Sequence, residues 1–214
     1  IELRSAIGLR IYTRSLLMLL QMALRKLGLE HVFNVRGHLA DAFFCKLDLD
    51  SPVDANLIKI LNKTMQDLVH EDIPIEYHKL PLQEARKYLA SIADNIHYLG
   101  LIQSLHQDTI SYYKARDTIN YFFSPLVPST GYLKVFELAP YRGDILIKYP
   151  NIDNIEVIPP YFDRPQLATV YTEAEAWAAL LECDNIADIN QKIATKEFED
   201  IMYVSEALQE KRIA

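Results

Sequence analysis

FFSPLVPSTGYLKVFEL, from Phe122 to Leu138, is the stretch of sequence that decides how the fold is interpreted. Its first half places two prolines, two serines, a threonine and a glycine between apolar runs, and these residue types favour turns. Leu126 and Val127 nevertheless stand in the middle of this loop, where a solvated loop would carry polar side chains. The loop is therefore the first place to look for a present or former site.

The composition limits the class of protein. Half of the 214 residues are hydrophobic, which is enough for a substantial core in one large domain or two small ones. There are 22 basic and 29 acidic residues, giving a formal net charge of -7 and no general basic surface for phosphates. Nucleic acid is therefore not an expected partner. Cys45 and Cys183 lie far apart in the sequence and are expected to be free thiols.

The N-terminal region has some features of a signal peptide, because Arg10 and Arg14 precede the apolar run Leu16 to Leu20. That run is short, and basic residues follow it where a cleavage site would need small residues. A buried amphipathic helix is the better interpretation. We therefore expect a cytoplasmic protein without a membrane partner. The missing initiator methionine and a C-terminus without a stop signal suggest a fragment of a longer protein.

Periodicity and turn residues predict an α+β fold in which helices pack on an antiparallel sheet. The expected domains are 1–150 (α+β), a linker or surface loop at 151–170, and a helical segment at 171–214. The expected helices lie at about 9–27 (ended by Gly28), after Ser51-Pro52, at 82–91, at 94–105, after Thr172 and after Phe198. The expected strands lie at 31–37, 42–47 and 75–80, followed by a meander of runs at 109–115, 118–123, 132–139 and 143–149.

Several sequence motifs of catalysis are absent from the chain. Neither GxxxxGK[ST] nor GxGxxG occurs, so these residues contain no phosphate-binding loop of the usual kind. No two histidines have the i, i+4 spacing of a helical metal site, and neither cysteine has a nearby partner. His38 and Cys45 flank the expected hairpin at 31–47. They form either a small site or, as we favour, a turn histidine and a buried thiol.

Two polar clusters remain as candidate sites. Arg14 and Ser15, beside Arg10, form either a solvated helix face or an anion site. Ser129, Thr130 and Gly131 form a turn whose N–H groups could face an anion, although turn geometry alone explains these residues equally well.

Three segments together resemble the second N-terminal domain of threonyl-tRNA synthetases, which hydrolyses mischarged tRNA. PLVPSTG resembles that family's PHVPSTG segment, and IYTRSLLMLLQMAL resembles its helix with an HxxxH motif. The segment IEYHKLPLQEA fits the same order, so the resemblance covers about 9–149. It implies an editing-domain-like fold, as in threonyl- and alanyl-tRNA synthetases.

A second resemblance covers the whole chain. GLRIYTRSL, FFSPLVPSTGYLKVFELAPY, ILIKYP, IPPYFDRPQL and SEALQEKRIA together resemble the N-terminal half of bacterial uridine kinase-like nucleoside kinases. In those proteins a synthetase-like region precedes a P-loop kinase domain. This resemblance implies that a small ubiquitin-like domain lies upstream of this fragment and a kinase domain downstream.

The positions of the synthetase's chemical groups differ in this chain. Thr13 and Leu17 replace the two histidines of HxxxH, and Phe122 and Leu126 replace the cysteine and histidine of the loop. Three of these four residues cannot bind a metal or exchange protons. The former reaction site is therefore expected to be filled by apolar groups, with Leu17 facing Leu126. Neither bound metal nor hydrolytic editing is expected.

The resemblances imply a non-catalytic accessory domain of a nucleoside kinase that senses a ligand, forms dimers or positions the kinase. The alternatives are an editing hydrolase and an RNA-binding relic. The fragment needs no cofactor, whereas the kinase domain of the parent would use ATP and magnesium. The candidate partners are that kinase domain, a nucleotide and a second copy of the chain. The candidate ligand residues are Arg14, Ser124, Ser129, Thr130 and Gly131, which would suit a phosphate or carboxylate.

Overall fold

The computed structural model describes residues 3–29, 33–47, 49, 51–90 and 108–213. The chain forms two compact units, one from Ile1–Lys79 with Ser111–Tyr171 and the other from Leu80–Ile110 with Thr172–Ala214. Each unit is described by itself below. The expected helix at 94–105 lies outside the described residues.

The larger unit contains an antiparallel four-stranded sheet with the order β1-β2-β7-β6. Its strands are β1 (Phe33–His38), β2 (Ala42–Leu47), β6 (Glu137–Tyr141) and β7 (Asp144–Lys148). The hairpin of β1 and β2 was predicted from the sequence and is confirmed. The β6–β7 turn places Arg142 and Gly143 at φ of 51° and 87°, a left-handed conformation that Gly143 adopts at no steric cost.

Helix α1 (Ala6–Lys26) lies in the core of this unit. Its N-cap is Ser5, whose hydroxyl accepts from the N–H of Gly8 at 3.0 Å. At its end Gly28 has a φ of 72°, as its predicted role as a left-handed cap requires. Helix α1 is long and apolar enough to cross a membrane, but 67% of its most apolar window is buried. The prediction of a buried core helix is therefore confirmed.

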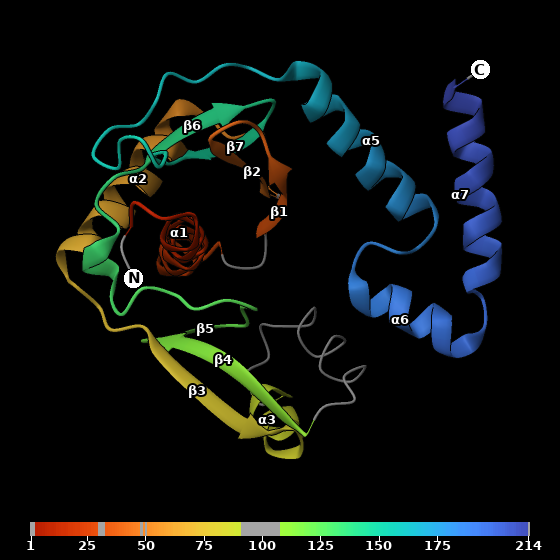
Figure 1. The fold of residues 1–214 in the computed structure, drawn as a ribbon, viewed down its shortest axis with the longest axis horizontal. Coiled ribbons are helices and arrows are strands. Elements are labelled where there is room, and N and C mark those ends of the chain that lie inside the picture. Colours follow the sequence, from red (N-terminus) through yellow and green to blue (C-terminus); the bar gives the residue numbers. More distant parts are fainter. Residues whose placement is uncertain (1–2, 30–32, 48, 50, 91–107, 214) are drawn as a thin grey trace. The chain divides into compact units, whose positions relative to one another are not determined.

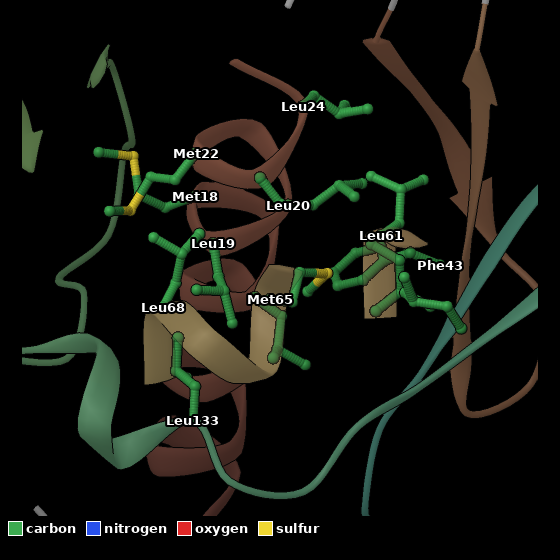
Figure 2. Packing of buried hydrophobic residues seen from close by; sticks show 14 of the residues in the cluster. Met18, Leu19, Leu20, Met22, Leu24, Phe43, Leu61, Met65, Leu68 and Leu133 are labelled. Atoms are coloured by element: carbon green, nitrogen blue, oxygen red, sulfur yellow. The ribbon is translucent and has the colours of Figure 1, made fainter. Parts of the chain in front are cut away.

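Helix α2 (Ala55–His70) packs against α1, and the two helices supply most of the apolar core seen in Figure 2. Leu19 and Leu20 of α1 lie beside Leu61, Met65 and Leu68 of α2, with Phe43 of β2 and Leu133 completing the cluster. The N-cap of α2 is Asp54, whose side chain accepts from the N–H of Leu57 at 2.7 Å. The helix was therefore predicted correctly, but the expected start at Ser51 is wrong.

A second, three-stranded sheet has the order β3-β4-β5, from β3 (Glu76–Pro81), β4 (Thr109–Ala115) and β5 (Thr118–Asn120). The sequence predicted β4 to β7 as one meander, and that prediction is wrong. The chain leaves this sheet after β5 and enters the four-stranded sheet at β6 (Figure 1). The loop at 121–136 makes this change of sheet possible, and a short 3-10 helix (Thr130–Tyr132) lies within it.

The segment after β7 packs on the four-stranded sheet. Leu39, Ala42, Phe44, Leu146 and Ala168 form a small cluster, against which Tyr161 and Tyr171 also pack. The ring of Tyr171 lies directly over Gly37, where a Cβ atom would come within 2.5 Å of it. The Tyr171 hydroxyl also donates to the carbonyl of His38 at 3.2 Å.

The described part of the smaller unit is mostly helical and also includes the end of β3 (80–81) and the start of β4 (109–110). It contains α3 (Leu82–Ala90), α6 (Ile186–Thr195), α7 (Phe198–Ile213) and the end of α5 (Pro165–Leu180). Asn185 and Asp188 form the capping box of α6. The predicted start of α7 at Phe198 is confirmed, whereas Thr172, expected to begin a helix, lies inside α5. The fold class is therefore α+β, with antiparallel sheets, packed helices and a helical C-terminal segment, as predicted.

Candidate functional site

The first half of the candidate site lies on helix α1. Thr13 is buried, and its hydroxyl donates to the carbonyl of Arg10 at 3.2 Å, within its own helix. Leu17, one turn later, is partly buried and packs on the main core cluster. Neither side chain offers a nitrogen or a thiolate to a metal or a water molecule.

The second half lies on the loop between β5 and the short 3-10 helix. Phe122 packs on the same core cluster and makes an edge contact with the Tyr113 ring, with centroids 6.3 Å apart. Leu126 and Val127 are only 9% and 8% exposed, so this part of the loop is core and not solvated surface. Leu17, Phe122 and Leu126 thus all belong to one apolar cluster.

A buried hydroxyl fixes the loop beside α1. Ser15 is fully buried, and its Oγ accepts from the backbone N–H of Val127 at 2.9 Å. The same hydroxyl donates to the carbonyl of Ile11 at 2.7 Å. The anion role considered for Ser15 therefore has no support, because both functions of its hydroxyl are used within the protein.

Arg14 joins the helix to the loop from the other side. Its Nη1 donates to Ser124 Oγ at 3.1 Å, so these two candidate ligand residues lie together. The guanidinium group has five N–H donors, and the contact with Ser124 uses one of them.

The remaining candidate ligand residues, Ser129, Thr130 and Gly131, are engaged elsewhere. The Thr130 hydroxyl donates to the carbonyl of Leu68 at 2.6 Å and accepts from the N–H of Ile73 at 2.8 Å. The N–H of Gly131 donates to Asp72 Oδ1 at 3.1 Å, and the Ser129 hydroxyl donates to the same oxygen. This turn therefore closes the C-terminal end of α2. The structure does not bring it together with Arg14 through any described contact.

Two further polar residues, His38 and Tyr149, contact each other at the end of β1. His38 Nδ1 and the Tyr149 hydroxyl are 3.0 Å apart, and the His38 ring lies 4.4 Å from the Phe43 ring, centroid to centroid. Burial and then the positive charge of Arg14 lower the pKa of His38, so its neutral form is favoured. The sequence singled out His38 only as a partner of Cys45. The sequence did not predict the contact with Tyr149. That residue directly follows β7, which pairs with β2 beside the turn after His38.

Cys45, in contrast, has no part in a reactive site. Its side chain is fully buried in the core cluster, and burial raises the pKa of its thiol far above the usual range. The favoured interpretation of a buried thiol is therefore correct. Within the described ranges, no group of three histidine, cysteine or acidic residues is arranged to hold a metal ion.

The comparisons with known proteins point to one class of relative. Over 147 residues the chain is 31% identical to a threonine–tRNA ligase of Laribacter hongkongensis, a match that covers 66% of this chain and 23% of that protein. Over 132 residues it is 30% identical to a threonine–tRNA ligase of Clostridium tetani, covering 59% of this chain and 20% of the ligase. A threonine–tRNA ligase of Bacillus velezensis is 28% identical over 143 residues, covering 64% and 22%. No protein-family model matches the chain.

This chain therefore spans about a fifth of the length of the relatives it matches. The similarity fits the editing-domain-like fold that the sequence predicted. What the fold and the comparisons establish together is that this chain contains a region similar to threonyl-tRNA synthetases.

Proposed function

We propose that this chain is a non-catalytic accessory region of a nucleoside kinase, in which a separate P-loop domain transfers phosphate from ATP to uridine or a related nucleoside. The observation that carries the non-catalytic part is the apolar packing of the former hydrolytic positions. Leu17, Phe122 and Leu126 lie in or against the main core cluster, and Thr13 bonds within its own helix. General acid–base or metal-assisted hydrolysis needs polar groups that these side chains do not have.

The kinase part of the proposal rests on the sequence. The extended VPSTG segment and the helical tail occur together in this chain as they do in the N-terminal half of uridine kinase-like proteins. The proposal includes the division into 1–150, 151–170 and 171–214, ATP and magnesium as cofactors of the kinase domain, and a cytoplasmic location. Hydrolytic editing is the alternative, and the apolar packing at 17, 122 and 126 argues against it.

Two assays test the proposal. In the first, the 214-residue chain is incubated with seryl- and threonyl-tRNA, beside a synthetase editing domain as the positive control. We expect ester hydrolysis no faster than in buffer, and hydrolysis above that rate would overturn the non-catalytic assignment. In the second, the full-length parent and this chain are each given ATP, magnesium and uridine. Phosphorylation by the parent alone is expected, and a parent without nucleoside kinase activity would overturn the kinase assignment.

A further inference from the structure

We propose that a cavity between the end of α2 and the β4–β5 turn binds a short zwitterionic peptide, with Lys114 holding its carboxylate and Asp117 its ammonium group. The cavity has a volume of about 600 Å³. Its lining comes from the end of α2 and the segment entering β3, with Glu71, Ile73 and Pro74, and from the other side of the β4–β5 turn, with Lys114, Arg116 and Asp117. All of these residues belong to the larger unit. The inference is independent of the proposed kinase.

The size of the cavity is the first argument. A volume of about 600 Å³ lies within the range of roughly 300–1,000 Å³ that is usual for sites of organic ligands. An inorganic ion would leave most of this space to water. A peptide of about two residues matches the volume better.

The walls of the cavity are fixed before any ligand binds. Ile73 exchanges two hydrogen bonds with Thr130, because its N–H donates to the Thr130 hydroxyl at 2.8 Å and its carbonyl accepts from the Thr130 N–H at 2.9 Å. The N–H of Ile75 donates to the carbonyl of Pro128 at 2.8 Å. On the other side Lys114 pairs with Ile119 in the β4–β5 hairpin. A ligand therefore has little of the backbone to order, which favours binding.

Two of the carboxylates in the cavity already have partners. Glu71 accepts from Arg116 Nη2 at 2.5 Å and from Lys26 Nζ at 3.3 Å. These contacts, that of Arg116 first, hold the pKa of Glu71 below its usual value, so its carboxylate stays ionised. Glu76, which also lines the cavity, lies 3.1 Å from His78 Nε2. Neither carboxylate is free to take up a ligand without losing a contact.

Lys114 and Asp117 are in a different state. Lys114 is half-buried and Asp117 is exposed. Within the described residues neither side chain forms an ion pair, with the other or with a third group. The ammonium group of Lys114 can only donate, and the carboxylate of Asp117 can only accept. One cavity thus offers two unpaired charges of opposite sign, and a peptide carries the complementary charges at the two ends of its backbone.

The balance of charge argues against ligands of a single sign. The lining contains three acidic and two basic residues. A nucleotide or another polyanion would meet the two acidic side chains Glu76 and Asp117 at the same time as Lys114, and a polycation would meet Lys114 and Arg116. A zwitterion avoids both repulsions. For two charge-assisted contacts in an open cavity, we expect a dissociation constant on the order of 1 mM.

The test is a titration of the whole 214-residue chain with leucyl-alanine, followed by the amide resonances of the β4–β5 turn. N-acetyl-leucyl-alanine lacks the ammonium group, and leucyl-alaninamide lacks the carboxylate, so the two blocked peptides report on the two contacts separately. Each should bind about tenfold more weakly than leucyl-alanine. Equal affinities of the three peptides, or no saturable shift in the turn at about ten times the expected constant, would overturn the proposal.

Two variants assign the contacts to residues. In Lys114→Gln protein, leucyl-alanine should bind no better than leucyl-alaninamide, and in Asp117→Asn protein no better than the acetylated peptide. Lys59→Gln and Asp153→Asn remove the same charges from exposed residues outside the cavity, and both should bind as the unaltered chain does. An undiminished preference for the free peptide in folded Lys114→Gln and Asp117→Asn proteins would show that the contacts are wrong. If Lys114→Gln does not fold, the blocked peptides on the unaltered chain still decide.

Discussion

Replacing Thr130 by valine removes one buried hydroxyl and leaves the shape of the side chain almost unchanged. That hydroxyl joins two backbone groups, the carbonyl of Leu68 at 2.6 Å and the N–H of Ile73 at 2.8 Å. Leu68 is in the last turn of α2, where carbonyl groups have no partner within the helix. Thr130 therefore caps this helix from a residue far away in the sequence.

The expected cost follows from these two bonds. Each buried backbone group that loses its partner costs about 1–3 kcal/mol, and the greater hydrophobicity of valine returns roughly 1 kcal/mol. Two such groups together cost about 2–6 kcal/mol, so we expect Thr130→Val to lower the free energy of unfolding by about 1–5 kcal/mol. Thr64→Val is the matched control, since the Thr64 hydroxyl donates to the carbonyl of Ile60 at 2.9 Å, within its own helix. That change should cost less than about 0.5 kcal/mol, because threonine and valine have similar helix propensities.

Urea unfolding followed by far-ultraviolet circular dichroism measures the difference between the two variants. Fluorescence is less suitable, because the single tryptophan, Trp177, belongs to the smaller unit. Amide exchange gives a local measure, because the Ile73 N–H should lose protection in Thr130→Val and keep it in Thr64→Val. Equal stabilities of the two variants, with Ile73 still protected, would refute the role assigned to Thr130.

Three other predictions concern close contacts and buried groups. Gly131→Ala should lower the free energy of unfolding by about 1–3 kcal/mol, because a Cβ atom there would lie 2.2 Å from Asp72 Oδ1; an unchanged urea midpoint would contradict this. Gly37→Ala should displace the ring of Tyr171, and the amide resonances at the start of α5 should shift if the contact at 2.5 Å is correct. Burial raises the pKa of Tyr12 to about 12, so the folded state binds this proton more tightly than the unfolded state, whose pKa is the ordinary 10.0. Stability should therefore fall as the pH rises from about 10 to 12, and Tyr12→Phe should remove that part of the pH dependence.

Local signals were sufficient for much of the fold. The spacing of apolar residues and Gly28 identified α1, and β-branched and aromatic runs around a short turn identified the β1–β2 hairpin. Pairing between distant strands was not encoded locally, so β4 and β6 were assigned to one sheet although they lie in two. The predicted start of α5 was wrong for another reason. Pro165 suits a first helical position, but Thr172 and Glu175 offered a competing start signal inside the same helix.

At the candidate site, too, the sequence did not predict contacts between residues that lie far apart along the chain. The sequence showed that a Ser-Thr-Gly turn can present donors, but not that Asp72, 57 residues before Ser129, accepts from them. A turn with good donors binds an anion only when no carboxylate of the protein already occupies it. The contact of His38 with Tyr149 was also missed, because the two residues lie 111 positions apart in the sequence.

The apolar residues at 17, 122 and 126 and the stability of this region are connected physically. A water-handling site keeps polar side chains beside the core, and each of them must be solvated or paired. With leucine at 17 and 126 and phenylalanine at 122, the same space adds to the apolar cluster, so the loop at 122–127 becomes part of the fold. A histidine placed at 126 would bury an imidazole among apolar side chains, which costs free energy unless the ring finds a hydrogen-bond partner. A polar contact still joins this loop to α1, because Arg14 Nη1 donates to Ser124 Oγ at 3.1 Å.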